Sequence, residues 1–337
     1  MKLAACLLAS VCLLGCARPP ENEVVVYSAL DQEFSQPILE NFEEATGITS
    51  RVKFDTESTK TIGLTQDIIA EGNAPRCDVF WNNEILNTLK LEKRGLLAEY
   101  RPKAAGDYPA MYRSPEHCWH GFAARARVLI VNTQVVPEED RPGSIYDFTE
   151  EKWRGRCGLA KPLFGTTATH LACLFAWLGD EKAEKLFRDM KTNDVRIYSG
   201  NKQVATAVAA GELAFGFTDT DDAMIELEDA KPVTIVYPDQ HQGGMGTLFI
   251  PNTVALIRDA PNEAEARRLI DYLLTAEVEI KLARGPSAQI PLSKKVRMPL
   301  RVETANSVRP MEVDFYAAAD KWDTAARFAR DLFAAAE

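Results

Sequence analysis

The chain has 337 residues, of which 46% are hydrophobic and 26% are charged, and its formal net charge is −10 at pH 7. This composition is typical of a folded globular protein, and the length predicts two domains or lobes. The acidic balance argues against a nucleic-acid partner, because the sequence has nothing resembling a basic face.

The N-terminal residues have the pattern of a lipoprotein signal peptide. Lys2 precedes an apolar run that ends at Leu14 and is too short to span a bilayer. Gly15 and Cys16 follow, which predicts cleavage before Cys16 and its lipidation; an ordinary signal peptide with a chance cysteine is the alternative. We therefore expect a signal peptide over 1–15 and a polar tether over 16–22. The mature protein would lie in the periplasm or on the cell surface, anchored to a membrane by lipid.

Short β-branched runs and amphipathic segments alternate along the mature chain. The first run predicts a buried strand, and the helix after it ends at Gly47, a favourable C-terminal residue. Strands are expected at 24–27, 51–54, 77–81, 128–131, 158–160, 195–198, 213–217, 233–236 and 254–257, with helices between them and later helices at 263–274 and 322–336. This alternation predicts an α/β fold with mostly parallel sheets flanked by helices.

Polar residues gather where predicted strands end and helices begin. Ligands of open parallel sheets bind at this edge. Taken singly, Ser28, Thr166, Asn201 and Asp219 have the alternative role of helix N-caps. Helix N-termini suit an anion, and Gly165-Thr166-Thr167 is the best candidate for one; the acidic run at 219–222 suits sugar hydroxyls, an amine or a metal. The candidate ligand-binding residues are Ser28, Ala29, Asp31, Asn82, Asn83, Glu84, Thr166, Thr167, Asn201, Asp219, Thr220 and Asp221.

Several segments together resemble the periplasmic ferric-binding proteins, a family of solute-binding subunits of ABC importers. The resemblance lies in 24–29, 42–48, 78–81, 95–97, 125–133, 165–167 and 200–204. It implies the two-lobed periplasmic binding protein (type II) fold with a hinge between the lobes. Lobe 1 would comprise 23–125 plus about 248–286, and lobe 2 would comprise 126–247 plus about 287–337. It also implies an ABC permease and ATPase as partners, a small-molecule or metal cargo, no cofactor, and a monomer.

The resemblance leaves the cargo open. Family members that hold ferric ion typically use two adjacent tyrosines, and here Thr220-Asp221 stands at that position. No two tyrosines are adjacent anywhere in the chain. Asp31, Glu84 and Asp221 would be the oxygen ligands if Fe³⁺ were the cargo. A phosphorylated or phosphonate-type solute is the alternative.

Four cysteines follow Cys16, and in an oxidising compartment they allow two disulfides in any of three pairings. They are Cys77, Cys118, Cys157 and Cys173. A Cys118–Cys157 bond is slightly favoured, and buried free thiols are the alternative.

An enzyme and a sensor accessory protein are the rival functional classes. His117 and His120 have a spacing found in zinc sites, but no further spaced Cys/His pair follows. No Gly-x-Ser-x-Gly motif or phosphate-binding Gly-x4-Gly-Lys loop is present. We therefore expect a binding protein rather than an enzyme.

Overall fold

The computed structural model describes residues 22–55 and 62–333. The predicted signal peptide, Cys16 and most of the tether lie outside these residues. The strands are β1 (Glu23–Ser28), β2 (Thr49–Phe54), β3 (Val79–Asn82), β4 (His120–Asn132), β5 (Cys157–Ala160), β6 (Arg196–Tyr198), β7 (Phe215–Asp219), β8 (Val233–Val236) and β9 (Phe249–Leu256). The helices are α1 (Gln32–Thr46), α2 (Ile62–Glu71), α3 (Leu86–Lys93), α4 (Gly165–Leu178), α5 (Asp180–Thr192), α6 (Asn201–Ala209), α7 (Thr220–Glu228), α8 (Glu263–Leu273), α9 (Ala276–Arg284) and α10 (Phe315–Phe333).

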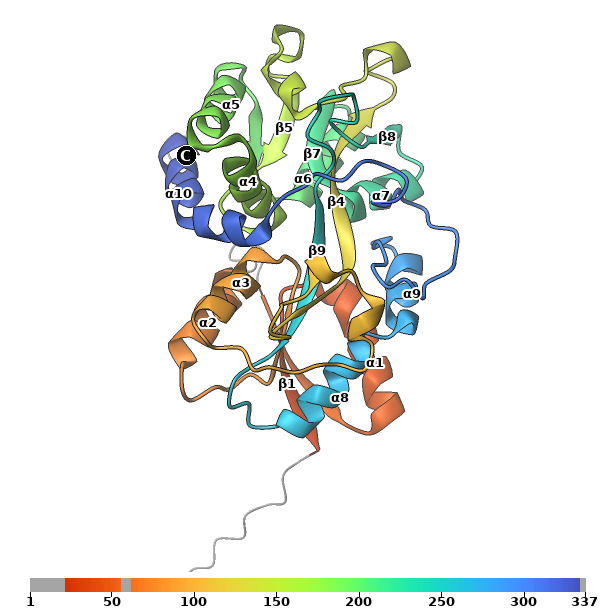
Figure 1. Cartoon of the computed structure of the whole chain (residues 1–337). Coiled ribbons are helices and arrows are strands. Elements are labelled where there is room, and N and C mark those ends of the chain that lie inside the picture. Colours follow the sequence, from red (N-terminus) through yellow and green to blue (C-terminus); the bar gives the residue numbers. More distant parts are fainter. Residues whose placement is uncertain (1–21, 56–61, 334–337) are drawn as a thin grey trace, which may run out of the picture.

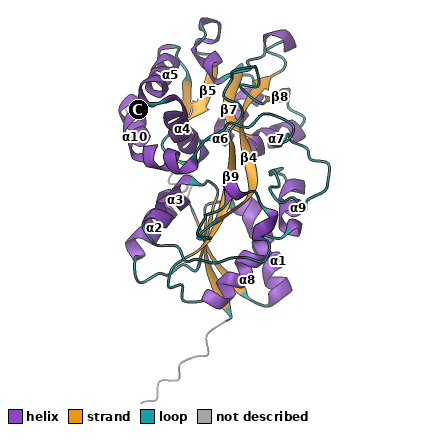
Figure 2. Ribbon diagram, in the orientation of Figure 1, coloured by secondary structure: helices purple, strands orange, loops and turns teal. Residues whose placement is uncertain are grey.

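The elements form two lobes, as predicted (Figure 1). One lobe contains β1 with α1, α2, α3, α8 and α9, and the other contains β5, β7 and β8 with α4 to α7 and α10. The long strands β4 and β9 run from one lobe to the other (Figure 2). The segment between α9 and α10 makes a third passage, so the backbone crosses between the lobes three times.

The described strands form one continuous path, in the order β2-β1-β3-β9-β4-β7-β5-β6, with β8 paired to β4. The outer strands of each lobe are parallel, as expected: β1 pairs with β2 and β3, and β5 pairs with β6 and β7. The crossing strands are antiparallel to their neighbours. This follows from their role, because β9 returns the chain in the direction opposite to β4.

The helices pack apolar faces onto this sheet, and α1 ends where the sequence predicts. In α1, Phe34, Ile38 and Phe42 are buried. The helix ends at Gly47, which has a left-handed φ of 69° and donates its N–H to the Glu43 carbonyl. A residue with a side chain is strained in that conformation, so glycine suits it. The last helix, α10, packs against α4 of its own lobe and also against α3 of the other lobe.

The favoured disulfide is wrong. Cys77, Cys118, Cys157 and Cys173 are all free thiols in the structure. Cys157 is buried in β5, whereas Cys118 precedes β4 at the other lobe, where it borders α3 and α10. A disulfide needs a short Cα separation and matching side-chain directions, and the structure pairs neither cysteine. Among the described residues, no helix combines the length and hydrophobicity needed to cross a bilayer.

Candidate functional site

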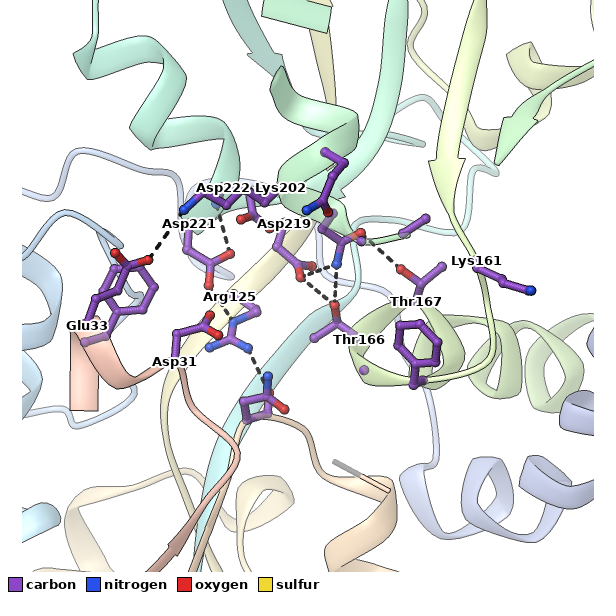
Figure 3. A pocket seen from close by; sticks show the side chains of 18 residues that line it. Asp31, Glu33, Arg125, Lys161, Thr166, Thr167, Lys202, Asp219, Asp221 and Asp222 are labelled. Carbon is purple, nitrogen blue, oxygen red and sulfur yellow. Dashed lines mark hydrogen bonds and ion pairs between the residues drawn. The ribbon is translucent and has the colours of Figure 1, made fainter. Parts of the chain in front are cut away.

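A cavity of about 240 Å³ is lined by both lobes, at the N-termini of four of the described helices. Asp31, Glu33 and Phe34 contribute from the start of α1, and Asn83 from the end of β3. Figure 3 shows the opposite side, where Thr166 and Thr167 begin α4 and Asp219, Asp221 and Asp222 surround the start of α7. The rest of the lining is Arg125, Ala160, Lys161, Phe164, Gly165, Gly200, Asn201, Lys202 and Gln203.

The structure brings most of the predicted site residues to this cavity. Those that line it are Asp31, Asn83, Thr166, Thr167, Asn201, Asp219 and Asp221. Ser28, Ala29, Asn82, Glu84 and Thr220 do not. Ser28 donates its hydroxyl to the Leu30 carbonyl, and Thr220 accepts the Ala126 N–H, so these two hydroxyls serve local backbone groups.

Glu84 has a structural role instead of facing the cavity. Its fully buried carboxylate accepts the backbone N–H groups of Leu86 and Asn87 at 2.6 and 3.0 Å. A carboxylate in this position stabilises the first turn of α3, because the helix begins with unpaired N–H groups. Glu84 also accepts a hydrogen bond from Thr169 of α4 at 2.9 Å. It therefore links the two lobes rather than presenting an open ligand position.

Arg127 connects the polar residues at the N-terminal ends of α4, α6 and α7. Its guanidinium is fully buried and contacts Asp219 at 2.8 Å, with longer bonds to Thr166 at 3.3 Å and Asn201 at 3.2 Å. Asp219 also accepts the Thr166 hydroxyl at 2.5 Å and the Asn201 amide at 2.9 Å. The N-cap residue Asp219 makes no cap hydrogen bond to its own helix. Its carboxylate is therefore engaged with the arginine and not with capping.

Arg125 lines the cavity from β4 and joins the two lobes. Its Nε lies 3.1 Å from a carboxylate oxygen of Asp221, and it donates to the Asn83 carbonyl at 3.0 Å. Burial alone would lower the pKa of Arg125, but nearby carboxylates outweigh it and raise the pKa above its ordinary value. These carboxylates are those of Asp221, Asp219, Asp31 and Asp222. The guanidinium is thus a permanent positive charge in the lining.

The acidic groups at α7 are close enough together to hold a cation. Asp219, Asp221 and Asp222 each offer an oxygen within 4.8 Å of the others. Two of the three are already paired with buried arginines, which offset their charge. None of the described residues that line the cavity is a tyrosine.

Comparison with known proteins identifies the family. Residues 80–315 match the model of the bacterial extracellular solute-binding proteins. The chain belongs to this family. It is 25% identical to iron uptake protein A1 of Synechocystis sp., over 82% of this chain and 79% of that protein. It is 23% identical to a putative 2-aminoethylphosphonate-binding periplasmic protein of Salmonella typhi, over 84% of this chain and 83% of that protein. Iron-bound HitA from Pseudomonas aeruginosa has the same fold, with a TM-score of 0.83 and 22% identity over 92% of this chain and 99% of that chain.

Further charged residues of the cavity lie outside the predicted set of ligand-binding residues. They are Arg125, Lys161, Lys202 and Glu33, with Asp222 from the predicted acidic run. Arg127 lies immediately behind the cavity and bonds to four of its lining residues. The arginines left a signal in the sequence: they stand two residues apart in an otherwise apolar strand. Alternate residues of a strand share one face, so two buried charges on one face require partners there.

Proposed function

We propose that this protein captures a small organic anion between its lobes and delivers it to an ABC permease. The cavity of about 240 Å³ is below the ~300–1,000 Å³ of common ligand pockets, which fits a small solute. The observation that carries the proposal is the pairing of Asp219 and Asp221 with Arg127 and Arg125. This pairing offsets the negative charge that a ferric ion would need.

The anion would bind at the starts of α4 and α6. Both helices begin without an acidic residue in the first turn, and neither N-cap residue makes a side-chain cap hydrogen bond. Their N-terminal N–H groups and the positive end of each helix dipole favour an anionic group. Lys161 lies in the same lining and adds positive charge, whereas Lys202 lies beside Glu33. Phosphate, phosphonate or a similar oxyanion has the acceptors to use both helices.

Ferric ion is the second candidate, because a relative is named an iron uptake protein and HitA was crystallised with iron. The donor set here argues against it. Ferric ion prefers hard oxygen ligands without competing positive charge, and each guanidinium lies at hydrogen-bond distance from a potential ligand. The two candidates therefore predict opposite results in a binding experiment.

The remaining parts of the proposal concern attachment and movement. We infer that Cys16 carries lipid and holds the protein on the outer side of a membrane. We take 23–125 plus about 248–286 as lobe 1 and 126–247 plus about 287–337 as lobe 2. In the closed arrangement Glu33 of α1 and Lys202 of α6 form an ion pair between the lobes, with 3.9 Å between the paired atoms. A ligand that contacts both lobes would stabilise this closed arrangement.

Native mass spectrometry with metal analysis tests the cargo. The purified protein should carry an organic anion or no cargo, and calorimetry should show binding of inorganic phosphate or ethylphosphonate. Lys161→Met should weaken this binding. The opposite result would be stoichiometric iron in the purified protein that is lost in Asp221→Ala and retained in Lys161→Met. This result would contradict the organic anion and favour ferric ion.

A further inference from the structure

The polar side chains at the starts of α4 and α6 donate their hydrogens to one another and to Asp219. Thr166 donates its single hydroxyl hydrogen to Asp219 at 2.5 Å, a contact visible in Figure 3. Thr167 donates its hydroxyl hydrogen to the Asn201 amide oxygen at 3.1 Å. The Asn201 amide has two hydrogens, which go to Thr166 at 3.0 Å and to Asp219 at 2.9 Å. All of these hydrogens are therefore engaged within the protein.

Arg127 sets the direction of these hydrogen bonds from behind the cavity. It donates to three side chains, those of Thr166, Thr167 and Asn201, at 3.3, 3.4 and 3.2 Å. Because each hydroxyl accepts a bond from the arginine, its own hydrogen points away from the guanidinium. The guanidinium lies over the Phe217 ring, with 4.5 Å between its central carbon and the ring centroid. This stacking fixes the plane of the guanidinium, whose N–H groups have rigid directions.

The main chain supplies the other hydrogen-bond donors at the starts of α4 and α6. The first N–H groups of a helix have no partner within it, and neither N-cap residue makes a side-chain cap hydrogen bond. Gly165, the first residue of α4, lines the cavity and has a left-handed φ of 61°. A left-handed residue followed by right-handed ones turns successive N–H groups toward one side, an arrangement that binds anions. A Cβ added at Gly165 would have nothing within 4 Å, so open space lies beside this backbone.

We propose that Arg127 is a positioning residue of the anion site. It holds the side chains of Thr166, Thr167 and Asn201 so that main-chain N–H groups, and not these side chains, bind the cargo. This inference rests on the proposed anion binding, and it changes the role of three residues that the sequence analysis selected as ligand-binding. The Arg127 charge also offsets the Asp219 carboxylate, which lines the cavity and would otherwise repel an anion.

Calorimetry with inorganic phosphate and ethylphosphonate tests this role on the whole mature chain. In the double variant Arg127→Met with Asp219→Leu, apolar side chains replace both charges of the pair, so the net charge is unchanged and the fold should persist. Phosphate binding should nevertheless weaken by about tenfold or more, the factor expected for one hydrogen bond to a charged group. Urea unfolding of the same samples separates this loss of affinity from a loss of stability.

Arg127→Lys is a second variant that decides the question if the double variant fails to fold. It keeps a positive charge beside Asp219 but removes the planar fork that reaches three side chains. It should weaken phosphate binding by about fivefold or more. The matched control is Arg188→Lys in α5, which alters an exposed pair with Glu184 and should leave phosphate binding unchanged.

Thr167→Val distinguishes positioning from direct contact, because valine has the same shape without the hydroxyl. In the otherwise unaltered protein it should weaken phosphate binding by about threefold or more. In the double variant it should change binding by less than about twofold, since the hydroxyl acts through Arg127 and the two effects do not add. Equal weakening in both backgrounds would mean that the hydroxyl contacts the anion directly, and it overturns the positioning role.

Two further outcomes decide between the positioning role and the anion proposal. If the double variant or Arg127→Lys folds and binds phosphate as tightly as the unaltered protein, the positioning role is overturned and the anion proposal stays in place. If the unaltered protein binds neither phosphate nor ethylphosphonate, the anion proposal is overturned and the positioning role falls with it.

Discussion

Removing Asp219 should destabilise the protein strongly, because it leaves the Arg127 charge buried without its main partner. The Arg127 side chain is 0% exposed and the Asp219 side chain 5% exposed, with 2.8 Å between the paired atoms. Two charges about 4 Å apart at an effective dielectric constant of about 20 attract by about 4 kcal/mol. Deleting one partner of a buried pair typically costs about 3–5 kcal/mol. Thr166, Thr167 and Asn201 still accept from Arg127 at 3.2–3.4 Å. We therefore expect Asp219→Ala to lower the free energy of unfolding by about 3 kcal/mol.

Urea unfolding followed by circular dichroism measures this effect in the ligand-free protein. The matched control is Asp189→Ala in α5, which breaks the exposed pair with Lys185 and should cost less than about 0.5 kcal/mol. The double variant Arg127→Met with Asp219→Leu removes both charges and should recover most of the loss. A loss below about 1 kcal/mol in Asp219→Ala, or a double variant no more stable than Asp219→Ala, would refute the assignment of this pair as a buried structural element.

Two further predictions concern pH and backbone conformation. Burial lowers the pKa of His120 from 6.5 to about 4, so the unfolded chain takes up a proton before the folded protein does. The neutral His120 side chain therefore contributes about 3 kcal/mol to the free energy of unfolding. This contribution is complete above about pH 6.5 and is lost as the pH falls towards 4. Urea unfolding at pH 7 and pH 4.5 measures how far the free energy of unfolding falls between the two pH values. This fall should be smaller in His120→Gln than in the wild type, while the exposed loop variant His241→Gln keeps the wild-type fall. Equal falls in all three proteins would contradict this. Gly246 has a φ of +83°, and an added Cβ would lie 2.6 Å from the Pro310 carbonyl oxygen. Gly246→Ala should therefore cost about 2–4 kcal/mol by the same assay, whereas Gly143→Ala, with nothing near its Cβ, should stay within about 0.5 kcal/mol; similar stability of the two variants would rule out the strain.

The sequence was sufficient to predict the alternation of strands and helices. It also predicts most of the polar strand-to-helix turns that line the cavity. Both depend on local signals: apolar period, cap residues, and the turn from strand to helix. The capping alternative for Asp219 does not hold, because its side chain makes no cap hydrogen bond. The Asp219 carboxylate pairs with Arg127, and only the tertiary structure brings these two residues together.

The extent of β4 could not be predicted locally. The apolar run predicts a strand at 128–131, whereas β4 spans His120–Asn132 and is buried throughout. Arg125 and Arg127 interrupt the apolar pattern, and they are tolerated because aspartates more than 90 residues later in the chain neutralise them. Pairing with β9, which lies still further along the chain, extends the strand. Likewise, nothing near Glu84 in the sequence indicates that Thr169 of the other lobe bonds to it.

The three passages of the backbone between the lobes also affect how the molecule responds to proteolysis. A single cut in β4, in β9 or in the segment before α10 leaves two covalent connections intact. The packing of α10 against α3 and α4 adds a non-covalent contact across the same gap. A preparation nicked once should therefore separate into two fragments on a denaturing gel, yet elute as one particle of unchanged size under native conditions.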